Sequence, residues 1–104
     1  MNSITIDGTV FSDAKMELLK EADGKETPMM KFIMMDTGVP FSRKKSLFIE
    51  VNFKKEAATS IFPYMKVGKP VIVRGELSTK GTKEPRYYIA ADIVKYIEPK
   101  GEAK

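Results

Sequence analysis

Basic side chains and aromatic rings follow one another along the middle and the end of the chain. Lysine and arginine neutralise phosphates, and flat rings stack on unpaired bases, each stacked base being worth about 1–3 kcal/mol. The pattern therefore makes these side chains candidates for a surface that binds nucleic acid. The residues assigned to this surface are Lys31, Phe41, Arg43, Lys44, Lys45, Phe48, Lys54, Lys55, Arg74, Lys80, Lys83, Arg86 and Tyr88.

The charge is distributed unevenly along the 104 residues. Residues 1–36 hold seven acidic and four basic side chains, for a net charge of −3, whereas residues 37–104 hold seven acidic and fourteen basic ones, for +7. The basic residues of the second part gather at 43–45, 54–55 and 80–86. Any one cluster could be a solvated loop, but three clusters that converge on one face would bind a polyanion.

Catalysis is not indicated by the composition. The chain has no cysteine and no histidine, which excludes thiol chemistry, disulfides, zinc fingers and the usual general base at neutral pH. The carboxylates are scattered, and neither Gly-Lys pair lies in a phosphate-loop sequence. We therefore expect no enzyme activity, no metal and no cofactor. We also expect no membrane partner, because no apolar run is long enough to span a bilayer.

Alternating apolar and polar residues predict strands in which one side is buried. Gly8 interrupts the first of them, as at a bend, and the alternation continues weakly to Leu19. The pair Asp23-Gly24 marks a hairpin turn before the second. The five predicted strands cover residues 3–11, 29–35, 47–53, 71–79 and 86–98.

A helix is predicted over residues 54–65, because Ala57, Ile61 and Met65 recur at helical spacing. Pro63 should end or kink it, and Gly68 should stop it. Five strands with one short helix between the third and fourth are typical of the all-β OB-fold, a Greek-key barrel. We thus predict one domain over residues 1–98, followed by a short polar tail at 99–104.

The phase of the third strand separates its core residues from its exposed ones. Leu47, Ile49, Val51 and Phe53 share one side, so Phe48 projects to the other, where it could stack on a base or contact a loop or subunit. By the same alternation Tyr87 and Tyr88 point to opposite sides of the fifth strand, so one of them should be in the core.

Several assigned residues have structural alternatives. Lys31, alone in an apolar strand that is buried on both sides, either extends to solvent or faces a phosphate groove. Arg74 either faces that groove or forms a cross-strand pair with an acid such as Glu50 or Glu76. Phe41 could anchor its loop in the core instead of binding.

The ordered set of elements resembles the bacterial and phage single-stranded DNA-binding proteins. The stretch from Phe48 to Leu77 is similar to the middle of that family's pattern, residues 2–10 to its first strand, 28–35 to its second, and the pair Arg86-Tyr87 to its last hairpin. The resemblance covers residues 2–97. It implies non-sequence-specific binding of single-stranded DNA in replication, recombination or repair, in the cytoplasm of a bacterium.

The resemblance also implies partners and residue roles. Phe48 matches an aromatic that stacks on a base, although the third strand is one residue shorter than usual, so Leu47 could hold that position. The alternatives are a primosome or replication adaptor that binds mainly protein, and an accessory OB subunit of an enzyme. A homodimer or homotetramer is implied, formed by pairing of first strands through Ser3, Ile4, Thr5, Ile6 and Asp7.

Overall fold

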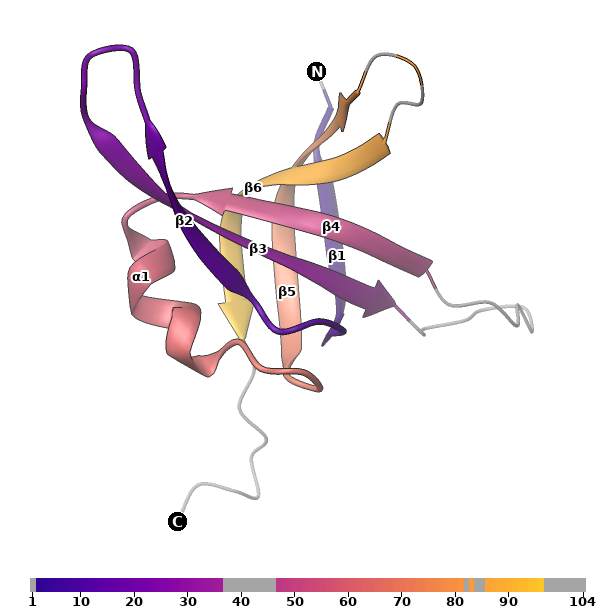
Figure 1. Ribbon diagram of the computed structural model, residues 1–104. Coiled ribbons are helices and arrows are strands. Elements are labelled where there is room, and N and C mark those ends of the chain that lie inside the picture. The colour runs from indigo at the N-terminus through magenta and orange to yellow at the C-terminus, as the bar shows by residue number, and fades with distance from the viewer. Residues whose placement is uncertain (1, 37–46, 82, 84–85, 97–104) are drawn as a thin grey trace.

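A computed structural model describes residues 2–36, 47–81, 83 and 86–96 of the chain (Figure 1). Six strands form one sheet, joined by a short α-helix and a 3-10 turn. Within the described ranges, no helix is both long and apolar enough to cross a membrane. The elements are β1 Ile4–Val10, β2 Lys15–Lys20, β3 Glu26–Asp36, β4 Leu47–Lys54, α1 Ala57–Ile61, η2 Phe62–Tyr64, β5 Pro70–Lys80 and β6 Arg86–Tyr96.

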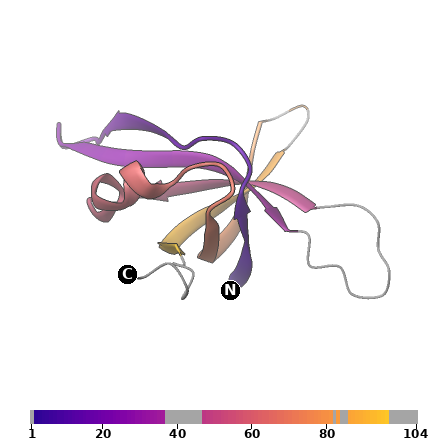
Figure 2. The same cartoon turned by 90° about the horizontal axis from the view of Figure 1, so that it is seen from below.

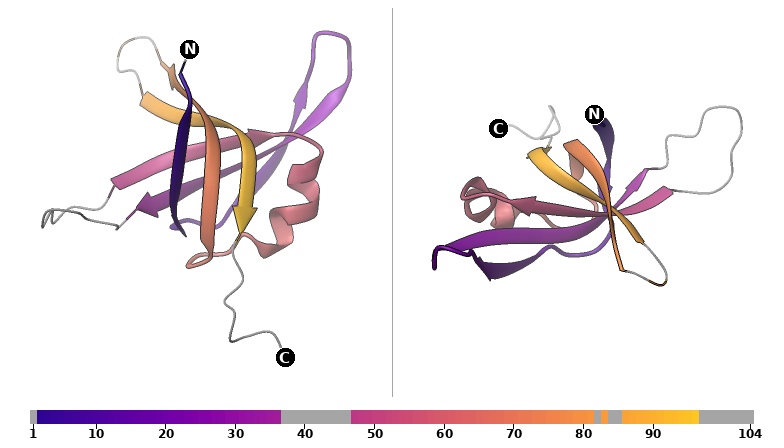
Figure 3. Two further views of the ribbon diagram at one scale, coloured as in Figure 1. Left: turned by 180° about the vertical axis from the view of Figure 1, so that it is seen from behind. Right: turned by 90° about the horizontal axis from the view of Figure 1, so that it is seen from above.

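The strand pairings return to their starting point. β1 pairs with β5, β5 with β6, β6 with β4, β4 with β3, and β3 again with β1 at Thr9 and Val10. All of these pairings are antiparallel except that of β4 with β6. Figure 3 shows β1, β5 and β6 side by side from behind, with β3 and β4 crossing them. This is the predicted OB-fold.

The strand predicted over residues 3–11 corresponds to β1, and the weak alternation up to Leu19 is a separate strand, β2. The amide hydrogens of Phe11 and Ser12 are both donated to the carbonyl oxygen of Ile33, at 2.7 and 3.3 Å. Phe11 and Ser12 therefore lie opposite the single residue Ile33, which interrupts the ladder of backbone hydrogen bonds. Pairing with β3 resumes at Lys15. The prediction of five strands was wrong in this respect, because the break depends on a carbonyl from a distant part of the chain.

Two glycines allow the strands to turn the corners of the barrel. A side chain at Gly8 would meet the carbonyl oxygen of Met35, where β1 crosses to β3, as the predicted bend requires. One at Gly75 would meet the carbonyl oxygen of Ala90, where the register between β5 and β6 shifts. Only glycine lets the backbones approach so closely.

The core lies inside the circuit of strands. Phe53 is 3% exposed, as predicted, and Phe32 is buried to the same extent. Leu47 at the start of β4 is 43% exposed, contrary to prediction. Methionine fills much of the remaining space. The buried cluster consists of Val10, Met30, Phe32, Met34, Val51, Phe53, Ala58, Met65, Val71, Val73, Ile89 and Val94.

The helix is shorter than predicted. Lys54 still belongs to β4, and after Ile61 the chain tightens into the 3-10 turn that holds Pro63, which cannot donate a helical hydrogen bond. The chain then reverses at Gly68, where φ is +92°. Figures 1 and 2 show α1 close to β3 and to the end of β6, and its Ala58 is fully buried there.

Candidate nucleic-acid interface

One side of the sheet faces away from the core. Paired residues on neighbouring strands point to the same side, so the register identifies this side from β2 across β3, β4 and β6 to the end of β5. We call it the outer face. Its residues are Lys15, Glu17, Leu19, Met29, Lys31, Ile33, Met35, Phe48, Glu50, Asn52, Lys54, Glu76, Ser78, Lys80, Arg86, Tyr88 and Ala90.

Phe48 occupies the outer face with half of its surface free. It is 51% exposed, while Val51 and Phe53 of the same strand are buried, so the predicted phase of β4 is confirmed. Its ring lies edge-on to that of Phe11, with 4.8 Å between the centroids and 66° between the planes. Phe11 is 49% exposed.

Sequence reasoning missed Phe11, because it was placed at the end of the first strand and given no role. A signal was present. Val10 is the last core residue of β1, and the residue after an inward-facing one should face outward.

Tyr88 lies on the outer face beside Glu50. The ammonium of Lys80 sits 5.5 Å from the centre of its ring and 2.6 Å from Oε2 of Glu50. Tyr87 points the other way and is 63% exposed, so the prediction that one of these two tyrosines is in the core is wrong. Tyr87 pairs with Thr79 near the end of the β5–β6 hairpin, and both residues are exposed there, whereas Tyr88 on the other side is half-buried.

Within the part of the chain that the structure describes, two depressions lie on the outer face. The first, of about 170 Å³, is lined by side chains from the β1–β2 link, β2, β3 and β4, among them Lys31, Ile33 and Glu50. The second, of about 290 Å³, has Leu19 and Met29 at one side and Asn52 and Tyr88 at the other. Each combines apolar walls with polar groups, as recognition of a nucleobase needs.

The lysines at the centre of the outer face are paired with glutamates. Lys31 lies 3.4 Å from Glu17, Lys54 lies 3.3 Å from Glu21, and the third pair joins Lys80 to Glu50. The two predicted alternatives for Lys31 were extension to solvent and a place in a phosphate groove. Lys31 does line the first depression, but its ammonium contacts the Glu17 carboxylate there. A phosphate that approaches this face must compete with these carboxylates.

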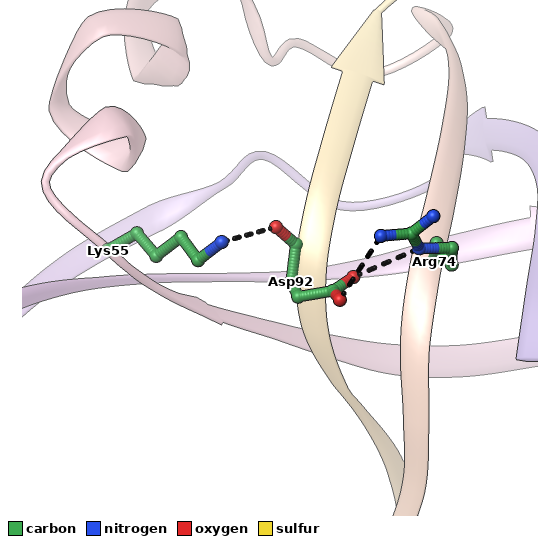
Figure 4. A network of polar contacts seen from close by, with 3 residues as sticks. All are labelled: Lys55, Arg74 and Asp92. Carbon is green, nitrogen blue, oxygen red and sulfur yellow. Dashed lines mark hydrogen bonds and ion pairs between the residues drawn. The ribbon is translucent and has the colours of Figure 1, made fainter. Parts of the chain in front are cut away.

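Arg74 and Lys55 lie on another flank of the barrel, where β5 and β6 run together. Figure 4 shows both side chains directed at Asp92: the guanidinium nitrogens of Arg74 lie 3.4 Å from its carboxylate, and Lys55 donates to its backbone oxygen at 2.7 Å. The cross-strand pair with an acid that the sequence offered as an alternative for Arg74 is therefore present, but the acid is Asp92 of β6 and neither Glu50 nor Glu76. Asp92 is the extra residue at the register shift, because Ala91 and Ile93 pair with consecutive residues of β5.

Two further assigned cations, Arg86 and Lys83, are exposed to solvent. Arg86 is exposed at the start of β6 on the outer face, and Lys83 is exposed in the link before it. The other assigned residues, Phe41, Arg43, Lys44 and Lys45, lie outside the described residues.

Strand β1 has an open edge at the residues predicted to form a subunit contact. It pairs with β5 from Ile4 to Thr9, but with β3 only at Thr9 and Val10. Among the described residues, no strand pairs with the second edge of residues 4–7. Ile4 and Ile6 pack on the core, while Ser3, Thr5 and Asp7 are exposed.

Solved structures with the same fold include proteins that bind single-stranded DNA. A small single-stranded DNA-binding protein from Streptomyces coelicolor matches with a TM-score of 0.73 at 22% identity, over 97% of this chain and 96% of that one. The second such protein of Mycobacterium smegmatis has a TM-score of 0.68 at 21% identity, over 91% and 87%. The corresponding domain of a Synechococcus protein has a TM-score of 0.67 at 18% identity, over 90% and 93%.

Comparison by sequence found no match, either among protein-family models or among curated proteins. At these identities the structural likeness establishes the fold. It confirms the OB-fold that the sequence predicts.

Proposed function

We propose that the protein binds single-stranded DNA without sequence preference through its outer face. The observation that carries this proposal is the pair of half-exposed phenyl rings, Phe11 and Phe48, on a face that also holds Tyr88 and several lysines. Rings of this kind stack on any base, because every base has a flat π surface. The solved structures with this fold carry names that state the same ligand, which supports the proposal.

The proposed activity is binding alone. Among the described residues, no cluster of carboxylates could hold a metal ion. We further propose a role in DNA replication, recombination or repair in the cytoplasm, as a homodimer or homotetramer joined through the open edge of β1. Proteins of those processes are the expected protein partners.

Fluorescence anisotropy with labelled oligo-dT and with a duplex of equal length tests the proposal. We expect much weaker binding to duplex, because stacking needs unpaired bases, whereas a merely basic surface would prefer the higher charge density of duplex. Equal or tighter binding to duplex would contradict the proposal.

The adaptor that binds mainly protein is the second candidate. The three lysine–glutamate pairs favour it, because they reduce the positive potential that a DNA-binding face needs. Negligible affinity for oligo-dT, together with a stable complex with a replication protein, would support this alternative.

A further inference from the structure

We infer that Phe11 and Phe48 form one composite stacking site, in which a single base contacts both rings. This inference rests on the proposed function and deepens it by assigning a second ring from the β1–β2 link. The occupant is a nucleobase of a single-stranded oligonucleotide.

The geometry of the two rings makes a corner. Their planes are inclined by 66° with centroids 4.8 Å apart, so a base that lies flat on one ring meets the edge or face of the other. Offset and edge-on contacts are the arrangements that aromatic rings prefer. Each ring keeps about half of its surface exposed, so the contact between them does not bury either one.

The backbone at Phe11 is held from two directions. Its amide hydrogen is donated to the carbonyl oxygen of Ile33 at 2.7 Å, and the amide of Ile33 is donated to the hydroxyl of Ser12 at 3.1 Å. On the other side, Val10 exchanges hydrogen bonds with Gly68 and Lys69, at 2.8 and 2.9 Å. Phe11 is therefore presented by a fixed segment, and little ordering entropy is lost when a ligand binds.

The core does not require the ring of Phe11. The buried cluster and the partly buried residues that pack against it are complete without Phe11. An aromatic ring exposed to water on a rigid segment has an unused apolar surface, which a ligand can cover.

Polar groups adjoin the corner, as a base with hydrogen-bonding edges requires. The first depression of the outer face begins at Ser12 and Asp13, directly after Phe11, and reaches Glu50, two residues beyond Phe48 on the same side. These carboxylate and hydroxyl groups can form additional hydrogen bonds with the polar edge of a nucleobase, which an aliphatic side chain lacks.

Substitutions at Phe11 test the composite site by oligo-dT anisotropy. Phe11→Leu keeps most of the apolar volume and removes the ring, and we expect affinity to fall by about fivefold or more. Phe11→Tyr keeps the ring and should lose much less affinity than Phe11→Leu. Thermal unfolding followed by circular dichroism verifies that each variant is folded.

Two further measurements separate stacking from other effects. An abasic oligodeoxynucleotide of the same length offers phosphates without bases, so Phe11→Leu should bind it as wild type does. In the pair Phe11→Leu and Phe48→Leu, the double variant should lose less than the product of the two single losses, because both rings serve one base.

The outcomes distinguish this inference from the proposed function. If wild type prefers oligo-dT over duplex and Phe11→Leu binds oligo-dT as tightly as wild type does, the composite site is refuted and the proposed function stands. An equal loss for abasic and normal oligonucleotides would also refute it. If wild type does not prefer oligo-dT, the proposed function fails, and this inference fails with it.

Discussion

Phe48 and Phe53 are five residues apart on one strand, yet the first is 51% exposed and the second 3%. We expect Phe48→Ala to weaken oligo-dT binding by about 1–3 kcal/mol and to leave the fold intact, because a stacking surface is lost and no core contact is. Anisotropy titration and thermal unfolding measure the two effects.

Phe53→Ala is the matched control for this prediction. Truncation of a buried phenylalanine should lower the free energy of unfolding by about 3–5 kcal/mol and affect DNA only through unfolding. A Phe48→Ala protein that unfolds while Phe53→Ala remains stable would mean that the sides of β4 are assigned in reverse.

Glu50 holds the ammonium of Lys80 at 2.6 Å on the outer face. We predict that Glu50→Gln raises affinity for oligo-dT severalfold, since it removes a charge that repels phosphates and frees Lys80 to bind one. Glu26→Gln removes the same charge from the start of β3, and no ion pair of Glu26 is found among the described residues. An equal rise in oligo-dT affinity for the two variants would contradict a specific role of Glu50, because the rise would then come from the change in net charge alone.

The sequence predicts the sides of β4 well, because Val51 and Phe53 set a period of two and Phe48 falls out of phase with them. It does not predict the ion pairs. Lys80 meets Glu50 and Lys54 meets Glu21 only after distant strands come together, so no local pattern reveals these pairs. The same holds for Arg74 and Asp92, whose contact depends on a register shift.

At the scale of elements, the open edge of β1 is the surface on which subunits are expected to pair. We predict a dimer or larger species in solution. Thr5→Lys should shift it toward monomer, because the added lysine would lie near the same lysine of the second subunit and the two charges would repel each other. Light scattering measures the mass. Thr59→Lys, on an exposed residue of α1, should have no effect.

A wild-type mass near 11.7 kDa at micromolar concentration would contradict the predicted oligomer. Equal shifts toward monomer in both variants would mean that charge alone, rather than the β1 edge, controls assembly.

Gly75 lies where β5 and β6 change register. We predict that Gly75→Ala lowers the free energy of unfolding by about 1–3 kcal/mol, because its methyl group would meet backbone atoms of Ala90 and Ala91 that cannot move aside. Urea unfolding measures it. Gly24→Ala meets no atom within 4 Å and should cost only the strain of its positive φ, about 1 kcal/mol. Equal losses would indicate that β6 adjusts to the added methyl.

Strands with clear alternation were predicted to within a few residues, as was the turn at Gly24. The break between β1 and β2 and the length of α1 were not. The end of α1 at Ile61, just before Pro63, agrees with the predicted effect of the proline, whereas α1 starts later than predicted because β4 continues through Lys54. The break depends on backbone hydrogen bonds, since the Ile33 carbonyl accepts two donors. Periodicity of side chains carries no information about such bonds.

For the whole molecule, we predict that affinity for oligo-dT falls with salt at a log–log slope of roughly −2 to −5, since each phosphate contact contributes about −0.7 through released counterions. In the proposed mode of binding, the basic residues of the outer face, from Lys15 to Arg86, supply several such contacts. Titration between low and moderate salt measures the slope. Affinity independent of salt would contradict binding through phosphates.

The pairing of β1 with β5 also affects when the molecule can fold during synthesis. Ile4 is opposite Gly75 and Thr9 opposite Pro70, so the first strand made has no partner there until most of the chain has been translated. Contacts between residues so distant slow folding, because a long loop must close before they form. Until β5 has been made, Ile4 and Ile6 lack this partner strand, so we expect the nascent N-terminal segment to be prone to aggregation during that interval.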